Sequence, residues 1–553
     1  MKSNTPVTAT VAPKQPPPET IQETKTRRWI ILSLWAIIAI FGLPAWYATT
    51  AVPRAELPIE VMTRWSEGQG SKIEFPITVA IDSSAVSSID TSVLVQKIQI
   101  DLDQRQESSL HGLHVVPAMR DLTSAHTLAE SFIYTHSSTH ERFQPQLVIE
   151  LRETAESASE SPVAKLQPFN PVLEIHYSQA SVSNDADLHS LAQFVINELQ
   201  ETYAEERATI THLIASDAAF ARSLDTQAQE SMSSELKQRS NRAFKYATTY
   251  HLTVSLFSGS DTPSSWDIKS ALDEYLSPFL QSFASISTFT LDTQVQLYAS
   301  LSTSLQGPNY DESSKQWTLL HSDLSAFINA AEWPLNPSIG TGPTMNFVVY
   351  VPSKAQSPLV ISETGGTSWL IPQWGGVQIV NQDEASNSTT LTKDALEPVM
   401  RTFADQLDAL LGLPQSPSSL PLRLSSLTRE RTTSLIISAS STLGALARLS
   451  LKLTSIAIPD NVATSVADAI QHLEQACEDL RQGRFDSALE HARSAETQAE
   501  QAFFDPSMVG QVYFPDEHKV AVYVPMLGPM AVPLVMAAMK EVKRIRQTRS
   551  FSR

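Results

Sequence analysis

The stretch IEFPITVAI, residues 73–81, decides the fold class, because its apolar side chains stand at every second position. This period of two predicts a β-strand with one buried face. Residues 250–256, YHLTVSL, repeat the same pattern. Five further segments have the composition of strands: residues 147–151, 172–177, 289–301, 346–351 and 377–380.

Helical patterns separate these strand candidates. The capping-box-like sequence Ser264-Ser-Trp-Asp267 opens one of them. Alternating strands and helices are typical of α/β folds. We therefore expect residues 53–421 to form one α/β domain, in the form of an αβα sandwich. The predicted helices cover residues 185–207, 265–283, 320–332 and 394–411.

The strand pattern ends after Pro421, and residues 422–519 predict a helical subdomain. A long apolar helix is expected over residues 427–456, followed by two helices joined at Gly483-Arg-Phe-Asp486. The free face of this hairpin either binds a partner or packs on the protein's own sheet, and the sequence leaves both open. The apolar stripes are Val466, Ile470, Leu473, Cys477 and Leu480 on the first helix, and Leu489, Ala492, Ala495, Ala499 and Ala502 on the second.

Two uncharged stretches lie near the chain ends. Residues 29–52 (WIILSLWAIIAIFGLPAWYATTAV) contain no Asp, Glu, Lys, Arg or His over 24 positions, and residues 520–539 contain none over 20. A membrane-spanning helix needs about 20 such residues. Trp29 and the Trp46-Tyr47 pair stand at the two edges of the first stretch, as in an aromatic belt. Two membrane spans are predicted; a cleaved signal peptide is the less favoured alternative for the first.

The charge distribution orients these spans. Residues 1–28 carry a net charge of +3 and residues 540–553 carry +5, so the total of −19 leaves −27 on residues 53–519. Basic flanks face the cytosol. We therefore expect two cytosolic tails and a large acidic domain on the lumenal side. Such an acidic protein is not expected to bind nucleic acid.

No catalytic constellation stands out. Cys477 is the single cysteine, so the chain forms no internal disulfide and no cysteine-based metal cluster. It lies on an apolar helical stripe beside acidic residues, which disfavour a reactive thiolate. No catalytic residue, metal site or cofactor is predicted. The alternative is a membrane-tethered lumenal glycosyltransferase using one of two D-x-D triplets, Asp101-Leu-Asp103 or Asp185-Ala-Asp187.

Four blocks of sequence resemble one family in the same order along the chain. They are FGLPAWYATTAVPRAELP (41–58), FVVYVPS (347–353), WLIPQWGGV (369–377) and FFDPSMVGQVYFPDEHKVAVYVPMLGPMAVPLV (503–535). This sequence resembles the PIG-S family of glycosylphosphatidylinositol (GPI) transamidase subunits.

The resemblance implies a non-catalytic subunit in the endoplasmic reticulum membrane that supports GPI attachment to precursor proteins. It also implies partners: the other transamidase subunits, including a caspase-like catalytic subunit that carries the cysteine and histidine, and membrane lipids, for which the GPI lipid is one candidate.

Four groups of residues are candidate sites. Lys25, Arg27 and Arg28 are placed to meet anionic lipid headgroups, or they only set the topology. Pro525, Pro529 and Pro533 recur every four residues, and each removes a helical N–H donor, which predicts a packing face inside the membrane or a simple kink. Trp369, Trp374, Gly375 and Gly376 form either an interface turn or part of the core. Asn387, in Asn387-Ser388-Thr389, is a predicted glycosylation site.

Overall fold

The computed structural model describes most of the chain, and it divides into two compact units. The larger unit comprises residues 58–445 and 466–500, and the smaller comprises residues 1–57, 446–465 and 501–553. The described residues are 20–42, 44, 54–82, 91–105, 111–118, 134–135, 142–143, 145–154, 162–178, 185–217, 234–299, 308–320, 342–382, 389–453, 456–508 and 516–551.

The first sheet of the larger unit has five strands in the order β2-β1-β5-β7-β6. Four strands are parallel, and the edge strand β6 runs antiparallel to β7. Val79 pairs with Val115 on one side and with Leu147 on the other, which fixes the register of β1. The strands are β1 (Phe75–Asp82), β2 (His111–Pro117), β5 (Leu147–Thr154), β6 (Val163–Leu166) and β7 (Val172–Ser178).

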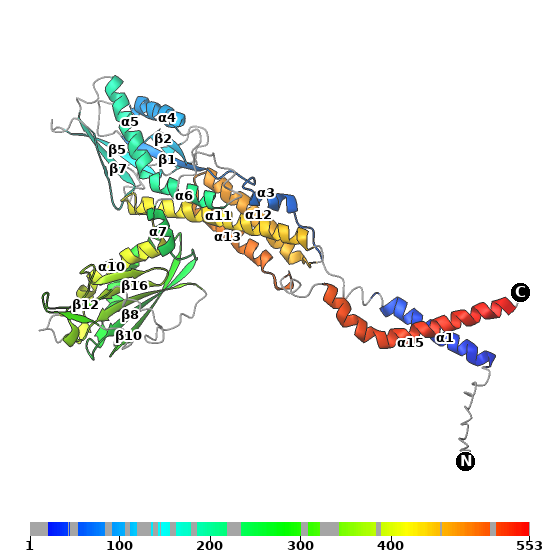
Figure 1. The fold of residues 1–553 in the computed structure, drawn as a ribbon. Coiled ribbons are helices and arrows are strands. Elements are labelled where there is room, and N and C mark those ends of the chain that lie inside the picture. The colour runs from blue at the N-terminus through cyan, green and yellow to red at the C-terminus, as the bar shows by residue number, and fades with distance from the viewer. Residues whose placement is uncertain are drawn as a thin grey trace, which may run out of the picture. The chain divides into compact units, whose positions relative to one another are not determined.

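One face of this sheet is covered by α4 (Thr91–Arg105) and α5 (Asp185–Thr202), which also contact each other (Figure 1). The side chains at alternate positions of β1 point into this core, as the period of two predicts. The opposite face carries a small cluster of Ala80, Val148 and Val172.

The second sheet has the order β10-β8-β13-β16-β15, again with four parallel strands and one antiparallel edge strand, β15. Its first face packs on α8 (Ile268–Ala271), the π-helical turn η6 (Leu272–Leu276), α9 (Ser277–Gln281) and α10 (Lys393–Leu411). The strands are β8 (Thr249–Ser258), β10 (Thr288–Gln296), β13 (Thr344–Val351), β15 (Ser368–Ile371) and β16 (Gly375–Ile379).

The second face of this sheet is also closed. A three-stranded sheet in the order β11-β12-β14 supplies Leu319, Leu359 and Ile361, which pack against Val348 and Tyr350 of β13. Its strands are β11 (Asn309–Asp311), β12 (Gln316–Leu319) and β14 (Leu359–Ile361).

The mixed α/β class and the C-terminal helical region are confirmed, but the expected single sandwich is replaced by two sheets with separate cores. Two predicted helices also differ. Residues 185–207 form α5 and the start of α6 (Ala204–Ser216), which break near Tyr203. Residues 265–266 form the short strand β9, paired with β17 (Thr390–Leu391), instead of a helix start. The helix predicted over residues 320–332 lies almost entirely outside the described residues.

The helical region begins with α11 (Leu420–Lys452), seven residues earlier than predicted. The hairpin of α12 (Asp460–Arg481) and α13 (Phe485–Phe503) is confirmed, with Gly483 between the helices at φ 72°. The α11 helix reaches both sheets, because Leu422 packs in the first core and Leu427 in the second. The other elements are α3 (Ile59–Ser66), β3 (Tyr134–Thr135), β4 (Arg142–Phe143), α7 (Ser234–Arg242) and η8 (Lys354–Gln356).

In the smaller unit, α1 (Ile21–Ile37) continues into a π-helical turn, η1 (Ile38–Gly42), and α15 spans Asp516–Phe551. Large apolar side chains are exposed on both helices, including Trp29, Phe41 and Val532. Trp46 and Tyr47 lie outside the described residues. Within the described part of the chain, α11 is the helix that has the length and composition of a membrane span, and half of its apolar stretch is buried in the protein.

Candidate functional site

A run of three charged residues, Arg429-Glu430-Arg431, interrupts the apolar sequence of α11 and organises the polar interior of the larger unit. Arg429 is almost fully buried and forms a bidentate ion pair with Glu206 of α6, with Nε–Oε1 at 2.5 Å and Nη2–Oε2 at 2.7 Å. Ser426 donates a hydrogen bond to the same carboxylate. The Arg429 guanidinium also lies 4.8 Å from the centre of the Phe485 ring of α13. This paired geometry satisfies both buried charges.

Glu430 faces α7, where Arg239 donates from Nη2 to its Oε2. Arg239 is shared, since its Nη1 also lies 3.1 Å from Oε1 of Glu205, and its Nε donates to the carbonyl of Gly412 at 2.9 Å. Oε1 of Glu430 is buried and has no hydrogen-bond partner. Burial raises the pKa of Glu430 to about 7, against the opposing charge of Arg239.

Arg431 turns towards the C-terminal end of α10. Its Nη2 donates to the carbonyl of Leu411 at 2.7 Å, which satisfies one terminal carbonyl of that helix. Its guanidinium lies 5.8 Å from the centre of the Tyr246 ring. Within the described residues, no carboxylate lies at ion-pair distance from Arg431.

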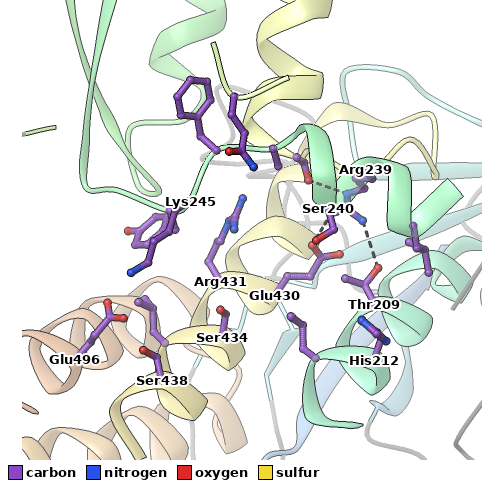
Figure 2. Close-up of a pocket in the computed structure, with 18 residues that line it drawn as sticks. Thr209, His212, Arg239, Ser240, Lys245, Glu430, Arg431, Ser434, Ser438 and Glu496 are labelled. Carbon is purple, nitrogen blue, oxygen red and sulfur yellow. Dashed lines mark hydrogen bonds and ion pairs between the residues drawn. The ribbon is translucent and has the colours of Figure 1, made fainter. Parts of the chain in front are cut away.

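These side chains border a cleft of about 420 Å³ (Figure 2). Its walls come from α6, α7, α11 and α13, together with the connection that follows α7 and the turn at Gln373. In Figure 2, Lys245 and Glu496 lie on one side of Arg431, and Glu430 lies on the other. The polar lining residues are Thr209, His212, Arg239, Ser240, Lys245, Tyr246, Gln373, Glu430, Arg431, Ser434, Ser438 and Glu496.

The three basic residues predicted to meet lipid headgroups lie at the start of α1. Arg27 and Arg28 both pair with Glu541 of α15, at 3.0 Å and 2.6 Å. The hydrogen bond from Arg28, and then the charge of Arg27, lower the pKa of Glu541. Lys25 is exposed. Two of the three predicted lipid contacts therefore make an ion pair between the two helices that carry the apolar stretches.

Pro525, Pro529 and Pro533 lie inside α15 and are exposed. Proline has no N–H, so the carbonyls four residues earlier lose their helical donor. The structure therefore keeps the predicted proline face accessible along one helix.

The predicted turn with Trp369 and Gly375-Gly376 contributes to the second core. Trp369 is buried in the cluster against the small sheet, and Trp374 packs at its edge. A Cβ at Gly375 would lie 1.8 Å from the carbonyl oxygen of Asn346, and a Cβ at Gly376 would lie 1.8 Å from Oε1 of Gln406. The geometry favours the core alternative for these four residues. Only Gln373 of this turn reaches the cleft.

Asn387 lies outside the described residues. Of the D-x-D residues, Asp101 accepts a hydrogen bond from Gln193 of α5 at 2.6 Å, and Asp103 accepts one from Gln99 at 2.7 Å. These contacts are ordinary helix-surface and helix–helix contacts. Asp185 and Asp187 lie in the first turn of α5. Among the described residues, no group of three or more His, Cys, Asp or Glu side chains could hold a metal ion.

Cys477 is fully buried on α12, as its place on the apolar stripe predicts. Burial raises the pKa of its thiol to about 11. A buried thiol of this kind is not an activated nucleophile.

Sequence reasoning missed the Arg-Glu-Arg run and the cleft beside it. The available signal was three consecutive charges in the middle of a long apolar helix, since such charges are rarely buried unless paired. Their partners lie 191 and 223 residues away for Glu430 and Arg429, so no local pattern indicates them.

The fold and these contacts define a mixed α/β protein with a helical region and with exposed apolar side chains on α1 and α15. Its candidate site is the cleft beside Arg429-Glu430-Arg431 of α11. Comparison with known families identifies it further. The family model described as "Phosphatidylinositol-glycan biosynthesis class S protein", PIG-S, matches residues 33–548. The chain belongs to the PIG-S family.

Curated relatives cover nearly the whole chain. It is 28% identical over 536 residues to the rat (Rattus norvegicus) GPI-anchor transamidase component PIGS, covering 91% of this chain and 93% of the relative. The human (Homo sapiens) protein of the same name gives the same identity and coverage. The fission yeast (Schizosaccharomyces pombe) GPI transamidase component PIG-S homolog is 26% identical over 547 residues, covering 96% and 86%. These comparisons give no support to the glycosyltransferase alternative.

Proposed function

We propose that this chain is a non-catalytic subunit of a GPI transamidase, which supports the attachment of GPI anchors by assembling and stabilising the complex. The family match along residues 33–548 carries this proposal. The buried, unactivated Cys477 supports the non-catalytic role, since it is the single cysteine of the chain. The nucleophilic cysteine and its histidine then belong to a partner subunit.

The proposed location is the endoplasmic reticulum membrane, with spans at residues 29–52 and 520–539, both tails in the cytosol and residues 53–519 in the lumen. The exposed apolar side chains of α1 and α15 support two membrane helices. The ion pairs of Arg27 and Arg28 with Glu541 support the topology, because they join the two predicted cytosolic flanks. Glycosylation of Asn387 would require the same lumenal placement.

The exposed proline face of α15 is proposed to pack against a helix of a partner subunit or against lipid. The carbonyls of Ala521, Pro525 and Pro529 need hydrogen-bond donors that their own helix does not supply. Lys25, together with the paired Arg27 and Arg28, is proposed to lie at the level of the anionic headgroups.

Affinity purification of the tagged full chain from detergent-solubilised microsomes tests the proposal. We expect the transamidase subunits, including the one with the catalytic cysteine, to co-purify in comparable amounts. Replacing Pro525, Pro529 and Pro533 together by leucine should weaken this recovery, whereas Val532→Leu and Met536→Leu on the same helix should not. Recovery of the chain without any transamidase subunit would contradict the proposed function.

A further inference from the structure

The cleft beside α11 has features of a ligand site. The packing of the helices around it does not explain the unpaired Oε1 of Glu430, or why the guanidinium of Arg431 has no carboxylate partner among the described residues. At about 420 Å³ it falls within the range of small-molecule pockets. Its charged lining is mixed, with Arg239, Lys245 and Arg431 beside Glu430 and Glu496, in a chain whose formal net charge is −19.

The first observation is an unsatisfied buried acceptor. Glu430 is only 5% exposed, and its Oε1 has no hydrogen-bond partner, while its Oε2 is held by Arg239. Leaving such an atom unpaired keeps the full desolvation cost of that oxygen. A ligand that brings a hydroxyl donor would recover this loss.

The second observation is a guanidinium that makes no ion pair at contact distance within the described residues. Arg239 is already neutralised by Glu205 and Glu430. Arg431, in contrast, has no carboxylate within ion-pair distance in the described part of the chain, and Lys245 stands exposed on the same side of the cleft (Figure 2). Arg431 offers a planar guanidinium, and Lys245, which also interacts with Glu496, offers a second cation, so the two can donate to a phosphate group.

The remaining wall suits a hydroxyl-rich ring. Ser434 and Ser438 follow Glu430 along α11 at helical spacing and line the floor of the cleft, and Tyr246 offers a half-buried aromatic ring beside Arg431. Ser438 is already hydrogen-bonded to Glu496, so Ser434 is the serine whose hydroxyl can donate to and accept from a ring hydroxyl.

We propose that this cleft binds a phosphorylated polyol, with its phosphate on Arg431 and Lys245 and a ring hydroxyl donating to Oε1 of Glu430. The proposal rests on the proposed function, in which the substrate of the complex is a phosphatidylinositol glycan. The ligand is then either a lipid-linked headgroup or a free polyol phosphate, which share this chemistry.

The test uses the purified full chain in detergent and measures binding by titration calorimetry. The probes are myo-inositol 1-phosphate, myo-inositol and inorganic phosphate. We expect saturable binding of inositol phosphate, with each of the two simpler probes weaker by about tenfold or more, as the loss of one charge-assisted contact implies.

Three variants separate the two ends of the cleft. Arg431→Gln and Lys245→Ala should weaken inositol phosphate and inorganic phosphate alike. Glu430→Gln should weaken inositol phosphate about fivefold or more, while binding of inorganic phosphate is unchanged or tighter because a negative charge is removed. Arg401→Gln, an equivalent change at an exposed arginine of α10, is the matched control and should have no effect.

In a further arm, micelles containing phosphatidylinositol compete with the soluble probe. Displacement of the probe by these micelles, lost in Arg431→Gln, assigns the cleft to a lipid-linked headgroup. Probe binding that the micelles do not displace, and that Arg431→Gln abolishes, assigns it to a free polyol phosphate. Equal affinity for inorganic phosphate and inositol phosphate overturns the proposal, as does binding that neither Lys245→Ala nor Arg431→Gln changes, or no saturable binding by the folded wild-type chain. Co-purification with transamidase subunits is measured on the same samples, so failure here is distinct from failure of the proposed function.

Discussion

The two five-stranded sheets of the larger unit share one topology. In each, the first strand is followed by at least one helix and then by a parallel strand that pairs with one side of the first strand. The next strand of the sheet pairs in parallel with its other side. A hairpin follows, and its antiparallel arm forms the edge of the sheet. With the short elements outside the two five-stranded sheets and their flanking helices left aside, the order β1-α4-β2-β5-β6-β7-α5 corresponds to β8-α8/η6/α9-β10-β13-β15-β16-α10. In both, the flanking helices contact each other over one face of the sheet. The α/β region is therefore one structural unit built twice.

The two copies differ on the face away from the helices. In the second copy the three-stranded sheet closes it with a cluster that includes Phe257, Tyr350 and Trp369. In the first copy the described residues of that face form a cluster of alanine and valine side chains. The helix-covered face is therefore common to the two copies, whereas the opposite face is packed differently in each.

The α11 helix joins the two copies, and the largest predicted effect comes from breaking this junction. Arg429→Ala leaves Glu206 buried without its partner, which should lower the free energy of unfolding by about 3–5 kcal/mol. Chemical denaturation of the purified chain measures this. The exposed Arg401→Ala should change it by less than about 0.5 kcal/mol. A loss for Arg429→Ala no larger than that of this control would show that the pair does not hold the two copies together.

The next largest loss of stability is expected for a substitution at Gly375, in β16 of the second copy. Gly375→Ala should cost about 3 kcal/mol, because the new Cβ meets the carbonyl of Asn346 and φ is 154°. Gly365, at φ 65° with open space around it, is the matched control and should cost about 1 kcal/mol. The difference in midpoint between the two variants reports the close approach of β13 and β16. Equal costs would mean that only the backbone angle matters.

The pH dependence of stability follows from buried carboxylates. Burial raises the pKa of Glu430 to about 7 and of Asp408 to about 6, from ordinary values of 4.5 and 3.8. Between about pH 4 and pH 7 the folded chain therefore holds protons that the unfolded chain has released. The contribution of these two carboxylates to the free energy of unfolding therefore falls as pH rises through this window and levels off above it.

Glu430→Gln should remove up to about 2–3 kcal/mol of this dependence. Thermal unfolding of both proteins at pH 5, 6 and 7 measures it. Identical pH profiles of the two proteins would contradict the assignment.

The smallest expected losses of stability compare the faces of the two sheets that lie away from the helices. Val148 pairs with Val172 on β7, as Val348 pairs with Val377 on β16, and all four lie on the face away from the helices. Val348→Ala should cost about 2–3 kcal/mol, because large neighbours cannot collapse into the space, and Val148→Ala about 1 kcal/mol. Denaturation midpoints compare them. Equal losses would indicate that the first copy is closed as tightly as the second.

The sequence predicted those parts of the fold that depend on local periodicity. The strands beginning near residues 73 and 250, and the hairpin around Gly483, were found because alternation and helical stripes are short-range patterns. The assembly of two sheets was not, because the pairing of β5 with β1, or of β13 with β8, joins segments far apart in the chain.

The candidate sites show the same limit. Arg27 and Arg28 were recognised as basic flanks, but their partner Glu541 lies more than 500 residues away. Gly375 and Gly376 were recognised as unusual, yet only the positions of Asn346 and Gln406 show why no side chain fits. The partners of Arg429-Glu430-Arg431 depend on how α6, α7 and α10 pack around α11.

The central claim is that this chain supports GPI attachment without supplying the nucleophile. Its most direct test is GPI attachment to a reporter precursor in microsomes depleted of the chain and then supplied with wild type or Cys477→Ala. We predict that attachment is lost on depletion and fully restored by both proteins, because Cys477 is a buried packing residue of α12 and not the nucleophile. Attachment that survives depletion, or that folded Cys477→Ala fails to restore, would contradict the account.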